Sequence, residues 1–397
     1  MISGAINPFK KIKICYVVSV DITLKITLLN CLKSLKQDGY EVSAVCSPGK
    51  WVEDIRKEGI KIKTIKITRK IFTPISDLIA LVKLFLYFKK EKPDIVHAQT
   101  PKAGFLGRIA ARLAGVPIVI YTNLGFYFHE NSSLIQRAFF IFMEKIAAKF
   151  SDLIFSINKE DIETAIKEKI CNPELIVYSG DGINIGRFNP SKFSPEQIIQ
   201  KRKSFGLDAQ NKVVGIVARL VIEKGYLDLF HAFKILSESF SEARLMVIGI
   251  EEPEKKDFFD LEFFAKKYGL EKKILFLGER TDVDELYSLM DVFVLPSHRE
   301  GLGRVVLEAS LLEKPVVATN IRGCRESVND SQTGILVPVK NSKKLAEALI
   351  YLFNNPEEAK KMGKAGRIKA MKEFDEQLVF DRIKKEYKRL IKEKLKI

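Results

Sequence analysis

Residues 291–326 read DVFVLPSHREGLGRVVLEASLLEKPVVATNIRGCRE. The pattern predicts a buried strand over Val292–Leu295, a polar loop that begins at Pro296, and a helix from Gly301 to Leu312. A second β-branched run, PVVATN, follows directly. A strand, a helix and another strand within so few residues are typical of a parallel βαβ unit.

The same alternation extends to both sides of this stretch. Toward the N-terminus it includes VVGIVARL with its following helix, ARLMVIGI and KILFLG, and it is present again from residue 10 to about residue 180. Between the two runs lies YSGDGINIGRFNPSKFSPEQ, whose Gly, Pro, Asn and Ser content predicts a linker. The sequence therefore predicts an α/β protein of two Rossmann-like, doubly wound parallel-sheet domains, over residues 1–190 and 191–373.

The last segment, residues 374–397, is predicted to be a separate amphipathic helix. Its apolar side chains recur at helical spacing between many charged ones, so the helix needs a surface to cover. The recurring residues are Phe380, Ile383, Tyr387, Leu390 and Ile391.

Composition and charge limit the class of protein. The 397 residues are 46% hydrophobic, 10% aromatic and 29% charged, which excludes a disordered, collagen-like or disulfide-stapled chain. The chain has 66 Lys and Arg against 50 Asp and Glu, a formal net charge of +16, and the excess is concentrated in residues 1–92. A basic surface suits nucleic acid, anionic lipid headgroups or a diphosphate-bearing substrate, and charge alone leaves all three open.

Cysteines and apolar segments predict a cytoplasmic location. The five cysteines form no CxxC pair and have only four histidines to join them, so we expect reduced thiols and no metal site. The apolar run Ile14–Val20 is too short for a signal peptide. The run Ile75–Phe88 contains Asp77 and Lys83 and is too short for a membrane-spanning helix.

Two glutamates in the opening stretch are candidates for ligand binding. Glu300 precedes the Gly-flanked start of a helix, whose backbone amides can bind a phosphate or a sugar hydroxyl. Glu308 lies about two helical turns further on, so the two carboxylates can contact one long polar ligand at different points. The alternative is a solvated Glu308 and a Glu300 that only flanks the helix start.

Two cations form a second candidate, in GIVARLVIEKGYLDLF. A predicted strand ends at Arg219, and a loop carries Lys224 to a Gly-led helix, an arrangement that suits a diphosphate. Two ordinary solubilising residues are the alternative. Asp282 and Asp284 match a metal-binding DxD pattern, but they stand at the start of a predicted helix, so we interpret them as capping residues.

Several of these segments together resemble the GT-B retaining glycosyltransferases of family 4. The resemblance rests on SHREGLGRVVLEA, ARLVIEKG, YSGDGIN and TNIRGCRE, and it covers nearly the whole chain. SVDITLK, VHAQTPKAGFLGRIAARLAG and GFYFHE resemble the branch that builds capsules, O-antigens and lipid-linked glycans. The resemblance implies two domains facing each other across a cleft, a C-terminal helix that crosses back to the first domain, and an acceptor sugar held on a polyprenyl diphosphate.

The resemblance also implies roles for residues of the second domain. Arg219 and Lys224 would bind the donor diphosphate and stabilise it as it leaves, while Glu308 would bind the ribose. Arg280 would border the nucleobase, although a surface arginine is the alternative. The residues expected at the donor sugar are Glu300, Gly301, Leu302 and Gly303, and Glu300 is expected to be catalytic together with Arg219 and Lys224.

Two departures from the family pattern concern the first domain. Ser19-Val20-Asp21 stands where many relatives have a glycine pair, and Leu124 stands where relatives often have a His. His129 is the nearest replacement for that His as a catalytic residue. For His129 and His97 a structural role is the alternative. The residues expected on the acceptor side are Ser19, Asp21, His97, Lys102 and Gly125.

The first domain also carries a candidate membrane surface. The apolar helix within residues 75–88 ends in Lys89-Lys90 and follows a basic strand. Apolar surface beside basic residues fits a face that lies on anionic lipid, and a core helix with solvated lysines is the alternative. The basic residues around the strand are Lys61, Lys63, Lys66, Arg69 and Lys70.

Together these features predict a retaining, metal-independent glycosyltransferase that moves a hexose or N-acetylhexosamine from a UDP-sugar to a polyprenyl-diphosphate-linked saccharide. It would need no cofactor besides the sugar nucleotide, bind no nucleic acid, and lie on the cytoplasmic face of the plasma membrane. A UDP-sugar 2-epimerase of the same fold is the alternative. A Rossmann dehydrogenase and a P-loop enzyme are disfavoured because GxGxxG after a strand and GxxxxGK[ST] are missing.

Overall fold

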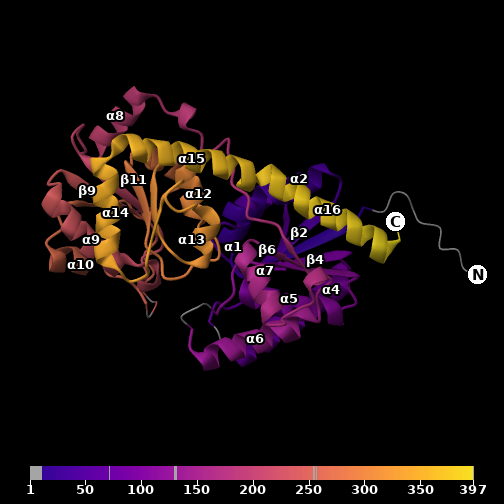
Figure 1. Ribbon diagram of the computed structural model, residues 1–397. Helices are drawn as coiled ribbons and strands as arrows, with labels where there is room; N and C mark the ends of the chain where they lie inside the picture. The colour runs from indigo at the N-terminus through magenta and orange to yellow at the C-terminus, as the bar shows by residue number, and fades with distance from the viewer. Residues whose placement is uncertain (1–10, 71, 129–131, 254, 256, 397) are drawn as a thin grey trace, which may run out of the picture. The chain divides into compact units, whose positions relative to one another are not determined.

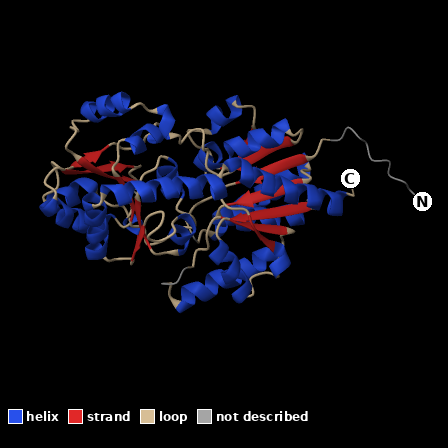
Figure 2. Ribbon diagram, turned by 45° about the horizontal axis from the view of Figure 1, so that its top comes forward, coloured by secondary structure: helices blue, strands red, loops and turns tan. Residues whose placement is uncertain are grey.

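The computed structural model describes residues 11–70, 72–128, 132–253, 255 and 257–396. The chain forms two compact units, Met1–Gly182 with Gln377–Ile397, and Ile183–Glu376. Each unit contains one parallel sheet flanked by helices, as Figures 1 and 2 show. The first boundary lies within the Gly- and Asn-rich segment that the sequence marks as a linker, at Gly182 rather than at residue 190.

The first unit has a seven-stranded sheet in the order β3-β2-β1-β4-β5-β6-β7. Ile14 and Tyr16 of β1 (Lys13–Val17) pack into one core with α2 (Leu29–Gln37) and α3 (Val52–Lys57), whereas Cys15 and Val17 pack into another with α4 (Pro74–Glu91) and α5 (Pro101–Leu113). Because neighbouring residues of a strand face opposite sides, both faces of the sheet are covered. The strands are β1 (Lys13–Val17), β2 (Glu41–Cys46), β3 (Lys61–Thr64), β4 (Ile95–Gln99), β5 (Ile118–Asn123), β6 (Leu153–Ser156) and β7 (Ile176–Tyr178).

The helices of this unit follow the predicted alternation with the strands. They are α1 (Asp21–Thr23), the π-helical turn η1 (Leu24–Leu28), α2 (Leu29–Gln37), α3 (Val52–Lys57), α4 (Pro74–Glu91), α5 (Pro101–Leu113), α6 (Leu134–Ala148), α7 (Lys159–Lys167) and the 3₁₀ turn η2 (Pro173–Leu175).

The second unit has a six-stranded sheet in the order β10-β9-β8-β11-β12-β13, again parallel. Its strands are β8 (Lys212–Val217), β9 (Ala243–Ile248), β10 (Ile274–Phe276), β11 (Val292–Leu295), β12 (Val316–Thr319) and β13 (Ile335–Val337). Its helices are η3 (Pro190–Lys192), α8 (Pro195–Ser204), η4 (Ile222–Lys224), α9 (Tyr226–Ser239), α10 (Leu261–Tyr268), α11 (Val283–Ser288), α12 (Arg304–Leu311), α13 (Arg322–Ser327), α14 (Ser342–Asn354) and α15 (Pro356–Phe374).

The C-terminal helix α16 (Glu376–Leu395) packs on the first unit. Asp375, with φ −57° and ψ 131°, departs from helical geometry and separates α16 from α15. The apolar side of α16 joins the core around Ile14 and Leu32, which confirms the predicted return of this helix to the first domain. The buried residues are Val379, Phe380, Ile383, Tyr387 and Leu390.

Two helices of the first unit expose many large apolar side chains. α5 packs against both α4 and α6. The large hydrophobic residues exposed on α4 are Ile75, Leu78, Ile79, Val82 and Leu86, and those on α6 are Leu134, Ile135, Phe139 and Phe142. Within the described part of the chain, no helix combines the length and the apolar character needed to span a bilayer. The helix within residues 75–88 is therefore only partly a core helix.

Candidate functional site

In the second unit, the two loops that carry the predicted donor residues leave neighbouring strands. β8 pairs directly with β11, and the chain order reverses between them, so their carboxyl ends form a topological switch point. Ligands of open α/β sheets bind at such a point. Gly225 has φ 75°, and a Cβ added there would lie 2.0 Å from the carbonyl oxygen of Pro296. This glycine therefore lets the loop after β8 approach the loop after β11.

Lys224 and Glu300 meet where these loops approach. Lys224 Nζ donates to Glu300 Oε1 over 2.6 Å, and the Ser297 hydroxyl donates to the same oxygen over 2.7 Å. The side chains of Lys224 and Glu300 are only 14% and 15% exposed, so the pair is largely shielded from water. The structure thus brings together two residues that the sequence assigned to one ligand.

Arg219 lies in the same basic surroundings but has a different carboxylate partner. Its Nη1 lies 2.9 Å from Glu252 Oε2, in the segment after β9. Burial raises the pKa of Glu223, but Arg299, then Lys224 and Arg219, lower it, so its pKa falls below the usual value. Of these cations, Arg299 contacts Glu223 directly, with Nε 3.1 Å from Oε1.

The loop before α12 differs in part from the predicted arrangement. Leu302 is buried, and α12 begins at Arg304 rather than at Gly301. The amide of Gly303 donates to the carbonyl of Gly323 over 3.1 Å. The expectation that the Gly303 amide faces a ligand is therefore not met, because the start of α13 already binds it. Gly301 lies beside Glu300 in the loop between β11 and α12.

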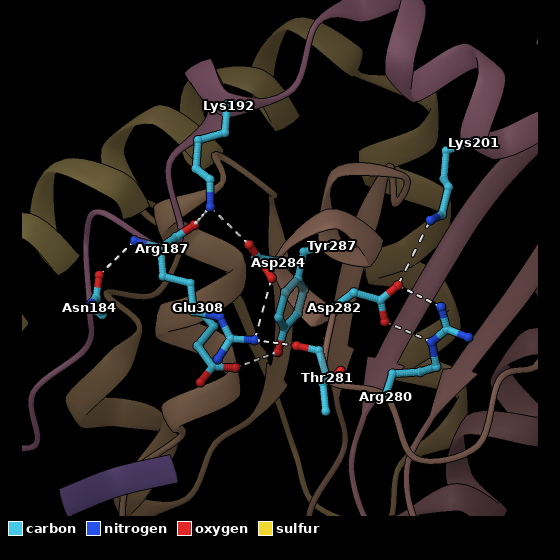
Figure 3. Close-up of polar contacts among 10 residues, drawn as sticks. All are labelled: Asn184, Arg187, Lys192, Lys201, Arg280, Thr281, Asp282, Asp284, Tyr287 and Glu308. Carbon is cyan, nitrogen blue, oxygen red and sulfur yellow. Dashed lines mark hydrogen bonds and ion pairs between the residues drawn. The ribbon is translucent and has the colours of Figure 1, made fainter. Parts of the chain in front are cut away.

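Glu308 lies on α12 and is nearly buried. Only 8% of the residue is exposed, so the solvated alternative is excluded. The Tyr287 hydroxyl donates to Glu308 Oε2 over 3.0 Å, and Arg304 Nε lies 3.6 Å from Glu308 Oε1. Figure 3 shows Tyr287 pointing from α11 toward this carboxylate.

Arg280 and the DxD aspartates belong to two separate groups of ion pairs beside this site (Figure 3). Arg280 binds both oxygens of Asp282, over 2.8 Å from Nε and 2.6 Å from Nη2. These hydrogen bonds hold the pKa of Asp282 below its usual value. Arg280 follows β10, which lies two strands from β8, so the structure does not pair it with the donor residues that meet between the loops.

The DxD aspartates stand at the start of a helix, as predicted, but the capping hydrogen bond is absent. Asp282 is the N-cap residue of α11 and makes no side-chain capping hydrogen bond, and Asp284 lies in the first turn. Asp284 instead lies 3.5 Å from Arg187 Nη2 and 3.3 Å from Lys192 Nζ, both in the linker segment. Among the described residues, no group of three or more His, Cys, Asp or Glu is placed to hold a metal ion.

In the first unit, Ser19 lies at the corresponding switch point, between β1 and β4. Its hydroxyl lies 2.8 Å from that of Thr100, which has a positive φ of 64° at the start of α5. Asp21 is 8% exposed and accepts hydrogen bonds from the amides of Trp51, over 2.7 Å, and Ile22, over 2.9 Å. The Asp21 carboxylate therefore braces the loop after β2.

His97 and Lys102 also have structural partners. His97 is fully buried, with Nδ1 2.6 Å from the hydroxyl of Tyr387 and Nε2 2.6 Å from that of Thr122. Burial lowers its pKa to about 3. Lys102 Nζ lies 2.9 Å from both oxygens of Asp77, which joins α5 to α4. Because its ring is enclosed, the structural alternative for His97 holds, and its expected place beside an acceptor is corrected.

The segment with the missing histidine is only partly described. Gly125 has φ 107°, and its amide donates to Asn123 Oδ1 over 3.2 Å at the end of β5. Leu124 is half-buried. His129, the expected replacement, lies outside the described residues.

Two residues of the site were missed from sequence. Ser297 is fully buried and binds Glu300, and Tyr287 binds Glu308. Ser297 directly follows the Pro that ends β11, which is a signal that could have identified it. Tyr287 lies 21 positions before its partner on another helix, so no local pattern joins them.

Comparisons with known proteins concern the family and the fold of the chain. Residues 13–158 match the family model described as Glycosyl transferase 4-like, and residues 197–369 match the model Glycosyl transferases group 1. The capsular polysaccharide biosynthesis glycosyltransferase CapM of Staphylococcus aureus is 31% identical over 385 residues, which cover 97% of this chain and 99% of that protein.

A second relative and a solved structure extend the comparison. The UDP-Gal:alpha-D-GlcNAc-diphosphoundecaprenol alpha-1,3-galactosyltransferase of Escherichia coli is 29% identical over 324 residues, which cover 81% of this chain and 82% of that protein. Anabaena Alr3699/HepE, solved in complex with UDP-glucose, matches with a TM-score of 0.81 and 22% identity over 95% of this chain and 99% of that one.

Proposed function

The chain belongs to the GT-B glycosyltransferases of family 4, and from this premise we propose that it extends a lipid-linked saccharide during the assembly of a surface polysaccharide. The donor is a UDP-sugar carrying a hexose or an N-acetylhexosamine, and the acceptor is a saccharide on a polyprenyl diphosphate. The E. coli relative, whose name gives both substrate classes, supports this choice. The relatives described above are glycosyltransferases, so the epimerase alternative gains no support.

The observation that carries the proposal is the contact between Lys224 and Glu300 at the switch point between β8 and β11. When the bond from the anomeric carbon to the diphosphate breaks, negative charge develops on the leaving oxygen. Lys224 and Arg219 are fixed cations that stabilise this charge, and Glu300 accepts hydrogen bonds from the sugar hydroxyls. Glu308, on the following helix, accepts hydrogen bonds from the ribose.

The transfer retains the configuration of the donor. The acceptor oxygen bonds to the anomeric carbon on the face from which the diphosphate leaves, and the departing diphosphate takes the proton of the acceptor hydroxyl. Because positive charge on Arg219 and Lys224 serves the leaving group, no metal ion and no further cofactor are required. Leu124 stands where relatives often have a His, and this replacement is consistent with a reaction that uses no side-chain base.

The first unit binds the acceptor and lies on an anionic membrane surface at its cytoplasmic face. α4 exposes apolar side chains such as Leu78 and Ile79, while Lys83, Lys89 and Lys90 on the same helix are exposed as well. Exposed apolar groups enter the headgroup region, and lysines bind the anionic headgroups. α6 also exposes large apolar side chains, among them Ile135, which is 86% exposed.

A transfer assay read by mass spectrometry tests the proposed reaction. Purified protein in EDTA is offered UDP- and GDP-sugars together with short polyprenyl-diphosphate-linked saccharides. We expect the acceptor to gain the mass of one sugar from a UDP donor, and proton NMR of the product to show an α linkage. A changed sugar nucleotide without acceptor gain would identify an epimerase, and a strict need for a divalent cation would refute the metal-free mechanism.

A further inference from the structure

We propose that Tyr287 is a positioning residue that fixes the carboxylate of Glu308 for the ribose of the donor. This inference rests on the proposed function, because it takes Glu308 to be the ribose-binding residue. Tyr287 does not itself contact the substrate in this proposal.

The hydroxyl of Tyr287 forms a hydrogen bond with Glu308. The residue is fully buried, and its hydroxyl donates to Glu308 Oε2 over 3.0 Å. A buried carboxylate needs donors, and a hydrogen bond to a charged acceptor is about twice as strong as a neutral one. Arg304 Nε lies 3.6 Å from the other oxygen, Oε1. The hydrogen bond from Tyr287 therefore fixes the Oε2 side of the carboxylate.

The ring of Tyr287 is held from two directions. Phe293, on β11, lies 5.5 Å away between ring centroids, and Phe188, in the linker segment, lies 6.1 Å away, both edge to face. Such contacts fix the plane of an aromatic ring, and a tyrosine has only two side-chain torsions to restrict. These ring contacts therefore direct the hydroxyl toward the carboxylate of Glu308 on α12.

The linker segment is in turn anchored to α11. Arg187 Nη2 donates to the carbonyl of Thr281 over 2.7 Å and lies 3.5 Å from Asp284 Oδ1. Lys192 Nζ lies 3.3 Å from the other oxygen of Asp284 (Figure 3). Arg187 and Lys192 thus hold Phe188 against Tyr287. The chain of contacts runs from the linker through Tyr287 to Glu308.

Binding of UDP and of a modified UDP can distinguish a positioning role of Tyr287 from a role in packing alone. The dissociation constants of UDP and of 2′,3′-dideoxy-UDP are measured by calorimetry for the wild type, Tyr287→Phe and Glu308→Gln. Tyr287→Phe removes only the hydroxyl and keeps the ring between Phe293 and Phe188. Tyr387→Phe is the matched control, because it removes a buried hydroxyl from the first unit.

The expected result is a loss of discrimination rather than a general loss of affinity. The wild type should bind UDP at least about tenfold more tightly than the dideoxy analogue, as expected for hydrogen bonds to a charged group. Both Tyr287→Phe and Glu308→Gln should reduce this ratio to about threefold or less. Affinity for the dideoxy analogue should change by less than about twofold in Tyr287→Phe. Tyr387→Phe should keep the wild-type ratio.

Three other outcomes have distinct meanings. If Glu308→Gln loses the discrimination and Tyr287→Phe keeps it, the positioning role is wrong while the proposed donor site stands. If the wild type does not discriminate, or binds no UDP, the assignment of Glu308 to the ribose fails and the inference fails with it. Equal weakening of both nucleotides by Tyr287→Phe, with a lower melting temperature, would show that Tyr287 serves folding alone.

Discussion

Lys224 Nζ lies 2.6 Å from Glu300 Oε1, although 76 positions separate the two residues in the chain. Lys224 follows β8 and Glu300 follows β11, so the pair joins two loops at the carboxyl edge of the sheet. A preformed pair keeps both side chains in place before a ligand arrives, which lowers the entropy that binding must overcome. The donor diphosphate then binds as a second anionic partner of Lys224, whose side chain Glu300 already orients.

Arg219 should contribute to binding of the nucleotide diphosphate through its charge. We expect Arg219→Gln to raise the dissociation constant of UDP by about tenfold, which corresponds to about 1.4 kcal/mol, because a charge-assisted hydrogen bond is lost. Calorimetry measures this change. Arg244→Gln is the control, because Arg244 lies near the start of β9, at the opposite edge of the sheet. Equal effects of the two substitutions would contradict the assignment of Arg219.

Catalysis should not depend on a divalent cation. Asp282 is held by Arg280, and Asp284 lies near Arg187 and Lys192, so these carboxylates are occupied by the cations of the protein itself. We expect turnover in EDTA to equal turnover in added Mg²⁺ or Mn²⁺ within about twofold. Loss of activity in EDTA that Mn²⁺ restores would show that the DxD pattern, or another group, binds a metal.

The buried His97 should make the first unit sensitive to acid. Burial lowers its pKa from 6.5 to about 3, so the unfolded chain binds a proton that the folded chain excludes as the pH falls below 6.5. The free energy of unfolding should therefore decrease by up to about 1.4 kcal/mol per pH unit between pH 6 and pH 4 from this residue.

Urea unfolding of three proteins isolates this contribution. His97→Gln should show a shallower dependence of the unfolding free energy on pH than the wild type. Tyr387→Phe removes a partner of His97 without removing the titrating group, so it should lose stability by a similar amount at every pH. If His97→Gln and the wild type give parallel profiles, His97 does not exclude protons in the folded state.

The apolar face of α4 should govern binding to membranes. We expect Leu78→Glu to reduce sedimentation with phosphatidylglycerol vesicles by about tenfold or more, because it removes an inserting side chain and adds repulsion from the headgroups. Ile368→Glu is the control, since Ile368 is similarly exposed, at 66% against 61%, but lies in the second unit. Unchanged sedimentation of Leu78→Glu, or equal losses in both variants, would count against the membrane face.

Patterns within short stretches of sequence correctly predicted the strand β11 and the buried side of the helix α16. The strand expected over Val292–Leu295 has those bounds in the structure, and the spacing of Phe380, Ile383 and Tyr387 identified the buried side of α16. The start of α12 was misplaced by three residues, because a contact with Gly323, on another helix, determines the conformation at Gly303. A single sequence contains no sign of that contact.

A site residue could be predicted only where its neighbours in the sequence mark it as a binding residue. Glu300 and Lys224 stand beside glycines in the segments that follow two strands, and the structure brings them together. His97 also stands in a strand, near the expected edge, but its partner Tyr387 is 290 positions away. Its burial against α16 depends on the tertiary fold, so the sequence could not separate a structural His from a ligand-binding one.

The most direct test of the donor site is the turnover of Lys224→Gln on the donor and acceptor pair that the transfer assay identifies. If Lys224 stabilises the leaving diphosphate, kcat should fall by about 100-fold or more, as on removal of a fixed donor from developing charge, while the melting temperature stays within a few degrees. A folded Lys224→Gln protein that keeps kcat within about threefold of the wild type would contradict a donor site between the loops after β8 and β11.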